Sequence, residues 1–255
     1  MGLGLILEFA KRDFTERYSG SALGMWWSLI WPVVHIFIYV FVFSKIMGAR
    51  LPGTSAVYSY SVYLVSGLVP WMAFSNTIGR ITTVFLDKKP VLTKMHVPLP
   101  RFPLYVVISE SVTCAMTLAV FIGVLLVSGF GLGRALLLLP VVYAVQQVFA
   151  YGLGFFLGIL NVFLRDLKEV VQIGLQLWFW FTPIVYVSDI LPRPAQALLN
   201  LNPAFVFVDA YHQIFLYGRV PEMGGLYVMV LVGHGLTAAA YMAFKRLEKD
   251  VRDFL

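Results

Sequence analysis

Charged residues are scarce in this chain: Asp, Glu, Lys and Arg make up 13% of its 255 residues, whereas 60% are hydrophobic. Soluble domains average about 25% charged and about 45–50% apolar residues. Six windows contain no charged residue at all: 18–44, 51–79, 111–133, 135–164, 170–188 and 223–244. A helix needs about 20 mostly apolar residues to cross the hydrocarbon core of a bilayer. The composition therefore excludes an ordinary soluble domain and predicts an all-α membrane protein with six transmembrane helices.

Cysteine and the sequence motifs of catalysis are also missing or rare. Cys114 is the only cysteine, which excludes a disulfide framework and a cysteine zinc site. The sequence contains no Gly-x-x-x-x-Gly-Lys-Ser/Thr phosphate loop, no His-Glu-x-x-His and no nucleophile elbow. Carboxylates at mid-membrane, which an ion-coupled transporter would need, are almost absent. We therefore expect neither an enzyme nor a protein that hydrolyses ATP by itself.

The polar segments between the windows are too short to form a separate soluble domain. A single membrane domain over residues 1–255 is the prediction. Its spans are expected at about 23–47, 58–80, 103–129, 135–161, 169–188 and 223–245. Pro32, Pro70 and Pro183 lie inside three of these spans and predict kinks or breaks there.

The Lys and Arg residues divide unevenly between the two sides that six crossings define. Fourteen of the 19 lie in the segments that include both termini, and five lie in the others. Because short cytoplasmic loops retain an excess of Lys and Arg, both termini are predicted to be cytoplasmic. This sorting accounts for the net charge of +6 without a nucleic-acid partner, since the basic residues form no single stripe.

Two further segments are predicted to be helical without crossing the membrane. In residues 1–20 one helical face is apolar, which is typical of an amphipathic helix at the interface; it carries Leu3, Ile6, Leu7, Ala10 and Phe14. Between spans five and six, the apolar runs 195–201 and 204–216 predict two short helices in or over the outer leaflet. A gate and a structural cap explain these two helices equally well.

Polar and aromatic side chains inside the spans are the remaining candidates for a transport path. Glu110 lies near the start of span three, where Arg101 or a neighbouring helix is its expected partner. Gln172 and Gln176 share a helix face, which suits interhelical hydrogen bonds or a hydrated route. The four aromatic residues at 178–181 cannot all face lipid, so at least one points into the bundle. Aromatic faces of this kind suit the apolar C–H surfaces of sugars.

Four stretches of the sequence are distinctive: GLVPWMAFSNTIGR at 67–80, KKPVLTKMHVPLPRFPL at 88–104, RDLKEVVQIGLQLWFWFTPIVY at 165–186 and LNPAFVFVDAYHQIFLYG at 201–218. Together they closely resemble the ABC-2 type permeases of bacterial polysaccharide exporters. The resemblance is strongest to the O-antigen (lipopolysaccharide) type, with the capsule and teichoic acid permeases related. It extends over nearly the whole chain.

The resemblance implies a homodimer in the bacterial inner membrane that moves polyprenyl-diphosphate-linked polysaccharide outward. It also implies a separate cytoplasmic ABC ATPase subunit in two copies, which binds ATP and Mg, so that this chain needs no cofactor. Residues 82–92 match the coupling segment of the family. The implied contacts with the ATPase are Asp87, Lys88, Lys89, Val91, Leu92, Arg165 and Asp166. The implied substrate path, on spans one and five, includes Tyr39, Phe43, Trp178, Phe181 and Tyr186.

Two alternatives remain at this stage. An ABC-2 permease for a drug or a small lipid would share the same architecture. A membrane-embedded enzyme acting on lipid-linked sugars is a different class, and the lack of clustered acid and base residues argues against it. Neither a metal site nor a catalytic residue is expected.

Overall fold

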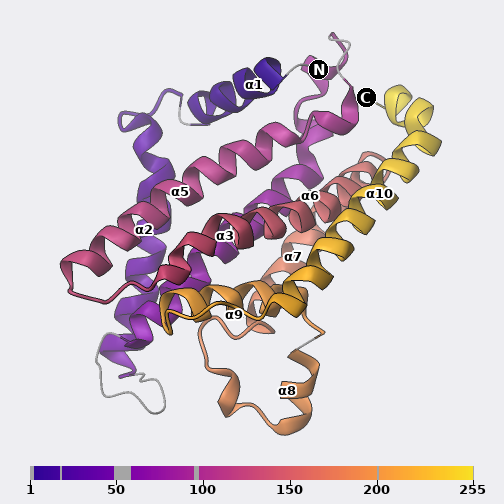
Figure 1. The fold of residues 1–255 in the computed structure, drawn as a ribbon. Helices are drawn as coiled ribbons and strands as arrows, with labels where there is room; N and C mark the ends of the chain where they lie inside the picture. Colours follow the sequence, from indigo (N-terminus) through magenta and orange to yellow (C-terminus); the bar gives the residue numbers. More distant parts are fainter. Residues whose placement is uncertain (1–2, 18, 49–58, 95–97, 200, 255) are drawn as a thin grey trace.

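The computed structural model describes residues 3–17, 19–48, 59–94, 98–199 and 201–254, and these contain helices but no strand. The α-helices are α1 (Leu3–Glu16), α2 (Trp27–Val40), α3 (Ser59–Asp87), α4 (Lys89–Leu92), α5 (Leu104–Val127), α6 (Leu139–Phe163), α7 (Leu167–Trp180), α8 (Arg193–Leu199), α9 (Pro203–Phe215) and α10 (Met223–Phe254). A π-helical segment, η2 (Phe41–Ile46), extends α2, and short 3-10 turns cover Gly24–Trp26, Leu99–Arg101, Arg134–Leu138 and Ser188–Ile190. The long helices form one bundle, with α1 at one end and α8 at the other (Figure 1).

Within the described residues, three helical segments are long and apolar enough to cross a membrane: Leu99–Val127, Arg134–Phe163 and Met223–Arg252. Trp27–Phe43 forms a shorter apolar helix. The predicted all-helical membrane fold is therefore confirmed, whereas the count of six crossings stays a prediction. The start of α1 and the end of α10 lie at the same end of the bundle (Figure 1).

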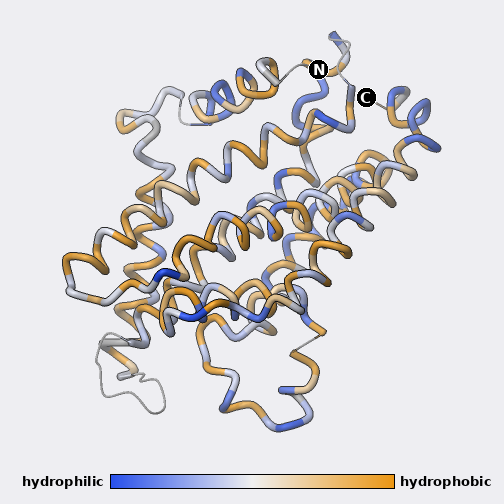
Figure 2. The backbone as a smooth tube through the Cα atoms, viewed as in Figure 1, coloured by the Kyte–Doolittle hydropathy of each residue, from blue (hydrophilic) through white to orange (hydrophobic). Residues whose placement is uncertain are grey.

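Hydrophobic residues run along most of the length of the helices, as the hydropathy colouring of the backbone shows (Figure 2), and many large apolar side chains are exposed. Phe37 on α2, Leu126 on α5 and Leu231 on α10 are all more than half exposed. Water would penalise so many exposed apolar groups, whereas lipid tails accept them without cost. The surface of this molecule is therefore suited to a bilayer.

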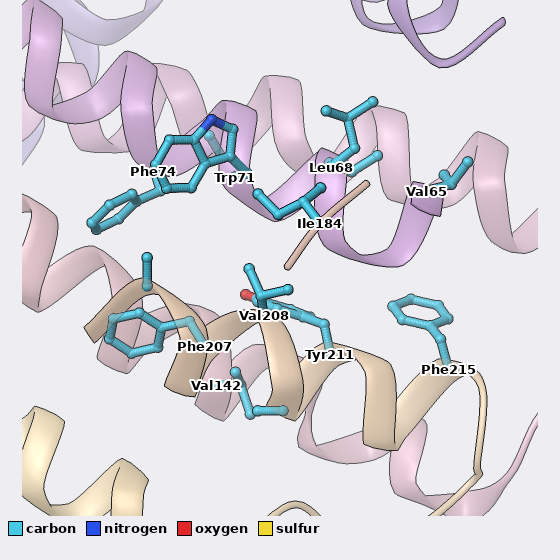
Figure 3. Close-up of a cluster of buried hydrophobic side chains, with 14 of the residues drawn as sticks. Val65, Leu68, Trp71, Phe74, Val142, Ile184, Phe207, Val208, Tyr211 and Phe215 are labelled. Atoms are coloured by element: carbon cyan, nitrogen blue, oxygen red, sulfur yellow. The ribbon is translucent and has the colours of Figure 1, made fainter. Parts of the chain in front are cut away.

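Helix α3 occupies the centre of the bundle. Residues 60–78 of α3 pack against α9 and α6 in a first hydrophobic core, in which Trp71, Phe74, Phe207 and Tyr211 are buried. Figure 3 shows the side chains of α9 facing those of α3, with Ile184 from the segment after α7 between them. The more polar composition of α3, rich in Tyr and Ser, fits this position because its neighbours shield it from lipid.

A second hydrophobic core lies at the end of the bundle that carries α1. It brings together Ile6 from α1, Phe85 from α3, Leu92 from α4, Phe155 from α6 and Val251 from α10. Helix α1, the α4 segment and the end of α10 are thereby joined to the same ends of α3 and α6. This arrangement determines where the charged side chains described below can meet.

Glycines on α6 allow its two neighbours to approach closely. A Cβ atom on Gly158 would lie 2.8 Å from the carbonyl oxygen of Ile81 on α3. On the other face, a Cβ atom on Gly152 would lie 2.8 Å from the backbone nitrogen of Thr237 on α10. Small residues at helix interfaces are a common means of bringing helices together in membranes. The close contacts of α6 with α3 and with α10 therefore require glycine at these two positions.

The starts of the expected spans lie within four residues of helix starts, whereas three ends differ: α3 continues to Asp87 instead of 80, α10 continues to Phe254 instead of 245, and α7 ends early. The helix expected over 169–188 ends at Trp180, because Pro183 lacks an N–H group and its ring clashes with the carbonyl group four residues earlier. By contrast, α3 continues through Pro70, where the side chain of Gln146 on α6 donates a hydrogen bond to the Pro70 carbonyl at 3.1 Å. Of the kink or break expected at Pro70, the break is therefore absent. The two short helices expected after span five are present as α8 and α9.

Candidate functional site

Five polar side chains from three helical segments form a cluster at the end of the bundle that carries α1, which we call the ion cluster. It consists of Asp13 and Arg17 from the α1 segment, Arg80 from α3, and Ser109 and Glu110 from α5. The Arg80 guanidinium donates to Glu110 Oε1 and to Asp13 Oδ1, each at 2.6 Å. Arg17 donates to Asp13 Oδ2 at 2.8 Å and to Glu110 Oε1 at 3.0 Å. Two guanidinium groups therefore neutralise two carboxylates.

Helical spacing on α1 brings its charged residues to this cluster. Ile6, Ala10 and Asp13 are all buried and lie on one face, and Arg17 follows four residues after Asp13. The buried face of α1 differs from the predicted one, because Leu7, which was expected on the buried face, is 49% exposed. Asp13 follows Ile6 and Ala10 at helical spacing, and this spacing could have identified it as a buried carboxylate. This signal was not used in the prediction.

The side chain of Asp13 is ionised in this setting. Burial alone would raise its pKa, but the Arg80 guanidinium, the Ser109 hydroxyl and Arg17 together hold the pKa below its usual value of 3.8. Ser109 donates to Asp13 Oδ2 at 2.7 Å. The cluster is thus a paired structural element. Of the two partners expected for Glu110, Arg101 or a neighbouring helix, the structure shows the second, with Arg80 of α3 and Arg17 paired to it.

A groove of about 580 Å³ runs between α2, α3 and α7. Its aromatic wall is made by Tyr39, Trp71, Phe179 and Trp180. Its polar wall carries hydroxyl, amide and guanidinium groups from α3 and α7: Ser75, Asn76, Arg80, Thr83, Gln172 and Gln176. Amides and hydroxyls can both donate and accept hydrogen bonds, and aromatic faces accept apolar C–H surfaces. The lining therefore suits a polyhydroxylated ligand.

The predicted path residues are only partly brought together. Tyr39 lines the groove, and Phe43 stacks on Tyr39 with ring centroids 6.1 Å apart without lining it. Trp178 and Phe181 instead line a separate hollow of about 340 Å³ between α7, α6 and α3. The Tyr186 hydroxyl donates to the Trp180 carbonyl at 2.9 Å. Because residues on a helix turn by about 100° each, Phe179 and Trp180 face the groove in place of their two neighbours.

Both glutamines on α7 line the groove, as the hydrated-route interpretation of the sequence expected. Gln172 also lies close to Gly79 of α3, where a Cβ atom would be 3.0 Å from its Nε2 atom. The small residue at 79 therefore leaves room for this amide. Sequence reasoning did not identify Arg80 as a groove residue, because it was counted only as a charge that determines topology.

At the other end of α3, two tyrosines bind the chain where α7 breaks. Tyr63 donates to the carbonyls of Pro183 and Tyr186 at 2.9 and 2.8 Å, and Tyr60 donates to the Val185 carbonyl at 2.6 Å. His212 of α9 stacks on the Tyr63 ring at a centroid distance of 3.9 Å. These bonds satisfy carbonyl groups of the non-helical segment that follows α7.

The predicted coupling segment lies beside both chain ends. Lys88 forms an ion pair with Glu16 of α1 at 3.1 Å, which lowers the pKa of Glu16, and Lys89 donates to the Phe254 carbonyl of α10 at 3.0 Å. Asp87 accepts a hydrogen bond from Thr83 at 2.6 Å and is exposed.

The hydrophobic residues of the predicted coupling segment point toward the core of the bundle rather than toward its surface. Leu92 is buried in the second core and Val91 is half-buried. The buried Leu92 therefore anchors the segment, and the exposed atoms available to a partner belong to Asp87, Lys89 and Pro90.

Arg165 and Asp166 form the exposed turn between α6 and α7, in which Asp166 is the residue before α7. The end of α6 lies close to the coupling segment. Phe163 packs edge-on against Phe254 at 5.4 Å, and the Phe254 carbonyl accepts the hydrogen bond from Lys89. The two predicted contact regions are thus linked through the end of α10.

A helical bundle with an apolar surface and a groove of mixed aromatic and polar lining suits a membrane transport subunit, and the family model "ABC-2 type transporter" matches residues 5–216. The chain belongs to the ABC-2 type transporter family. It is 31% identical over 253 residues to the O-antigen export system permease protein RfbA of Myxococcus xanthus, covering 97% of this chain and 94% of the relative.

Two further relatives show how far the similarity extends. The protein of the same name from Klebsiella pneumoniae is 27% identical over 252 residues, which cover 98% of this chain and 95% of the relative. The polysialic acid transport protein KpsM of Escherichia coli is 19% identical over 212 residues, covering 83% and 81%. The family resemblance expected from the sequence is confirmed.

Proposed function

We propose that this chain is the permease subunit of an ATP-driven exporter that moves a lipid-linked polysaccharide of the O-antigen type across the bacterial inner membrane. The observation that carries the proposal is the groove between α2, α3 and α7, which combines an aromatic wall with amide and hydroxyl groups. The near full-length similarity to two permeases named for O-antigen export supports the same cargo class.

The proposed topology has six crossings, made by α2 with η2, α3, α5, α6, α7 and α10. Both termini and α4 would face the cytoplasm, in line with the excess of Lys and Arg there. Helix α7 has 14 residues, about 21 Å, which is less than the roughly 30 Å of hydrocarbon. The segment after α7 would complete the crossing. Lipid offers the carbonyl groups of this segment no hydrogen-bond donor, but Tyr60 and Tyr63 donate hydrogen bonds to them. Helices α8 and α9 would then form the gate on the outer side.

The cargo follows from the chemistry of the groove. A ligand that slides must be held by many weak contacts rather than by one fixed site. Aromatic faces and amides provide such contacts for successive sugar rings. A homodimer would place two such grooves around one path, and the polyprenyl chain would remain in lipid beside them.

The energy for transport would come from two copies of a cytoplasmic ABC ATPase subunit, which would bind the nucleotide and its magnesium. Closure of these subunits would push on residues 87–92. The exposure of Asp87, Lys89 and Pro90 supports this contact. Arg165 and Asp166, on the neighbouring turn, would form its second part.

The groove is tested by replacing Gln172 and Gln176 with leucine in the exporter reconstituted with its ATPase. Losing two hydrogen-bonding amides removes about 1–3 kcal/mol, so ATP-driven uptake of glycan into inverted vesicles is expected to fall roughly tenfold. The matched control is Val170 to leucine on the same helix, which lies outside the groove lining and should leave uptake unchanged. If the wild type moved a small fluorescent lipid or a drug but no glycan, the cargo assignment would fail.

The coupling contact is tested by reversing the charges of Lys88 and Lys89 to glutamate. Export is expected to drop roughly tenfold or more, equivalent to about 1.4 kcal/mol of lost binding to the ATPase. Co-purification of the ATPase is the direct measurement, and Lys249 to glutamate, on the exposed surface of α10, is the control. Leu92 is left intact because burying a carboxylate there would disrupt the second core. Unchanged assembly and export would reject the assignment.

A further inference from the structure

A hollow of about 960 Å³ lies between α1 and α5 and borders the ion cluster at Ser109. It is separate from the groove, which lies between α2, α3 and α7. Figure 1 shows α1 alongside α5 at the end of the bundle. None of the transport steps proposed above uses this space.

The walls of the hollow are apolar and partly open. Leu7 and Phe14 of α1 line one wall, and Ile108 and Val112 of α5 line the other. Leu7 is 49% exposed and Val112 is 45% exposed, so large aliphatic surfaces on both helices face open space. In a bilayer, a space of this kind is filled by a hydrocarbon chain rather than by water.

The rim of the hollow is basic. Lys11 and Arg12 line it together with Glu16. That carboxylate is shared between two cations, Arg12 at 2.9 Å and Lys88 at 3.1 Å. Lys11 also lines the hollow, so its lining carries two cations and one carboxylate, and that carboxylate is further paired with Lys88. The excess positive charge lies beside an apolar hollow.

We infer that this hollow binds an anionic phospholipid, with the phosphate at Lys11 and Arg12 and an acyl chain between Leu7 and Val112. Basic groups next to an apolar crevice match the two parts of such a molecule. The bound lipid would fill the gap between α1 and α5 that the ion cluster closes only at one end. Its placement in the cytoplasmic leaflet rests on the proposed topology, whereas its binding does not depend on the cargo.

The test is native mass spectrometry of the purified full chain in detergent, titrated with phosphatidylglycerol or with phosphatidylcholine of the same acyl chains. The wild type is expected to retain phosphatidylglycerol preferentially. Because each basic side chain near a membrane surface contributes about 1 kcal/mol, Lys11 to glutamine with Arg12 to glutamine should weaken that retention roughly 30-fold. The control pair, Lys245 and Arg246 to glutamine on α10, should change it little.

A second variant tests the contribution of the acyl chain to binding separately from that of the basic side chains. Val112 to tryptophan fills the hollow and keeps both cations, so retention of either lipid should fall while the melting temperature is maintained. Equal retention of the two lipids by the wild type would overturn the inference, as would phosphatidylglycerol retention that is unaffected by both variants. Competition by free inorganic phosphate without any effect of Val112 to tryptophan would also overturn it, because it would show a simple anion site.

Discussion

Replacing Glu110 with alanine is expected to destabilise the chain by about 3–5 kcal/mol, the largest effect of any single substitution considered for this chain. Glu110 is 1% exposed and accepts hydrogen bonds from both Arg17 and Arg80. Removing one partner of a buried ion pair leaves its counterpart charged and uncompensated, and the cost is that of the isolated charge. Unfolding in mixed micelles, followed by circular dichroism, measures the change.

Glu248 supplies the matched control for this experiment. It pairs with Arg252 at 3.0 Å on the exposed surface of α10, with both side chains more than two-fifths exposed. Exposed pairs contribute about 0–1 kcal/mol, so Glu248 to alanine should change stability little. If the two substitutions had equal effects, the ion cluster would not hold α1 to the bundle.

Replacing Gly158 with alanine is expected to destabilise the bundle by about 1–3 kcal/mol, although alanine is the better helix former by about 1 kcal/mol. The new Cβ atom would lie 2.8 Å from the Ile81 carbonyl oxygen, which belongs to the backbone of α3 and cannot rotate away. Helices α3 and α6 would have to separate. The melting temperature of the purified chain in detergent reports the change.

Gly123 on α5 is the control for the effect of helix propensity alone. A Cβ atom there meets no heavy atom within 4 Å, so Gly123 to alanine should be neutral or slightly stabilising. The opposite signs of the two substitutions are the prediction. A stabilising Gly158 variant would mean that α3 and α6 are not in the close contact described.

Much of the fold could be predicted because the absence of charge marks where helices run. The ends of α5 and the start of α10 fall within two residues of the expected limits, since the chemistry of the bilayer dictates both. The end of α7 falls eight residues before the expected limit of 188, because Pro183 stops this helix while Pro70 does not stop α3. The sequence predicts a kink or a break at both prolines alike, and its periodicity does not reveal through which of them a helix continues.

The candidate site was harder to predict for the same reason. Helix phase indicated that some of the four aromatics at 178–181 turn inward, but packing decided that Phe179 and Trp180 face the groove. The ion cluster joins residues 13, 80 and 110, whose distances along the chain carry no signal about contact. A single sequence gives the residue types of such a cluster without giving their partners.

Helix α3 runs unbroken for 29 residues, about 43 Å, from Tyr60 and Tyr63 at one end to Arg80 and Asp87 at the other. Its described backbone contains no non-helical residue that could absorb a displacement. In the proposed topology, an axial push or a tilt applied at the Asp87 end would therefore reach the tyrosine-bound carbonyls at the opposite end of the helix. In that arrangement α3 would act as one rigid element between the two faces of the membrane, with the sugar-compatible groove along its side.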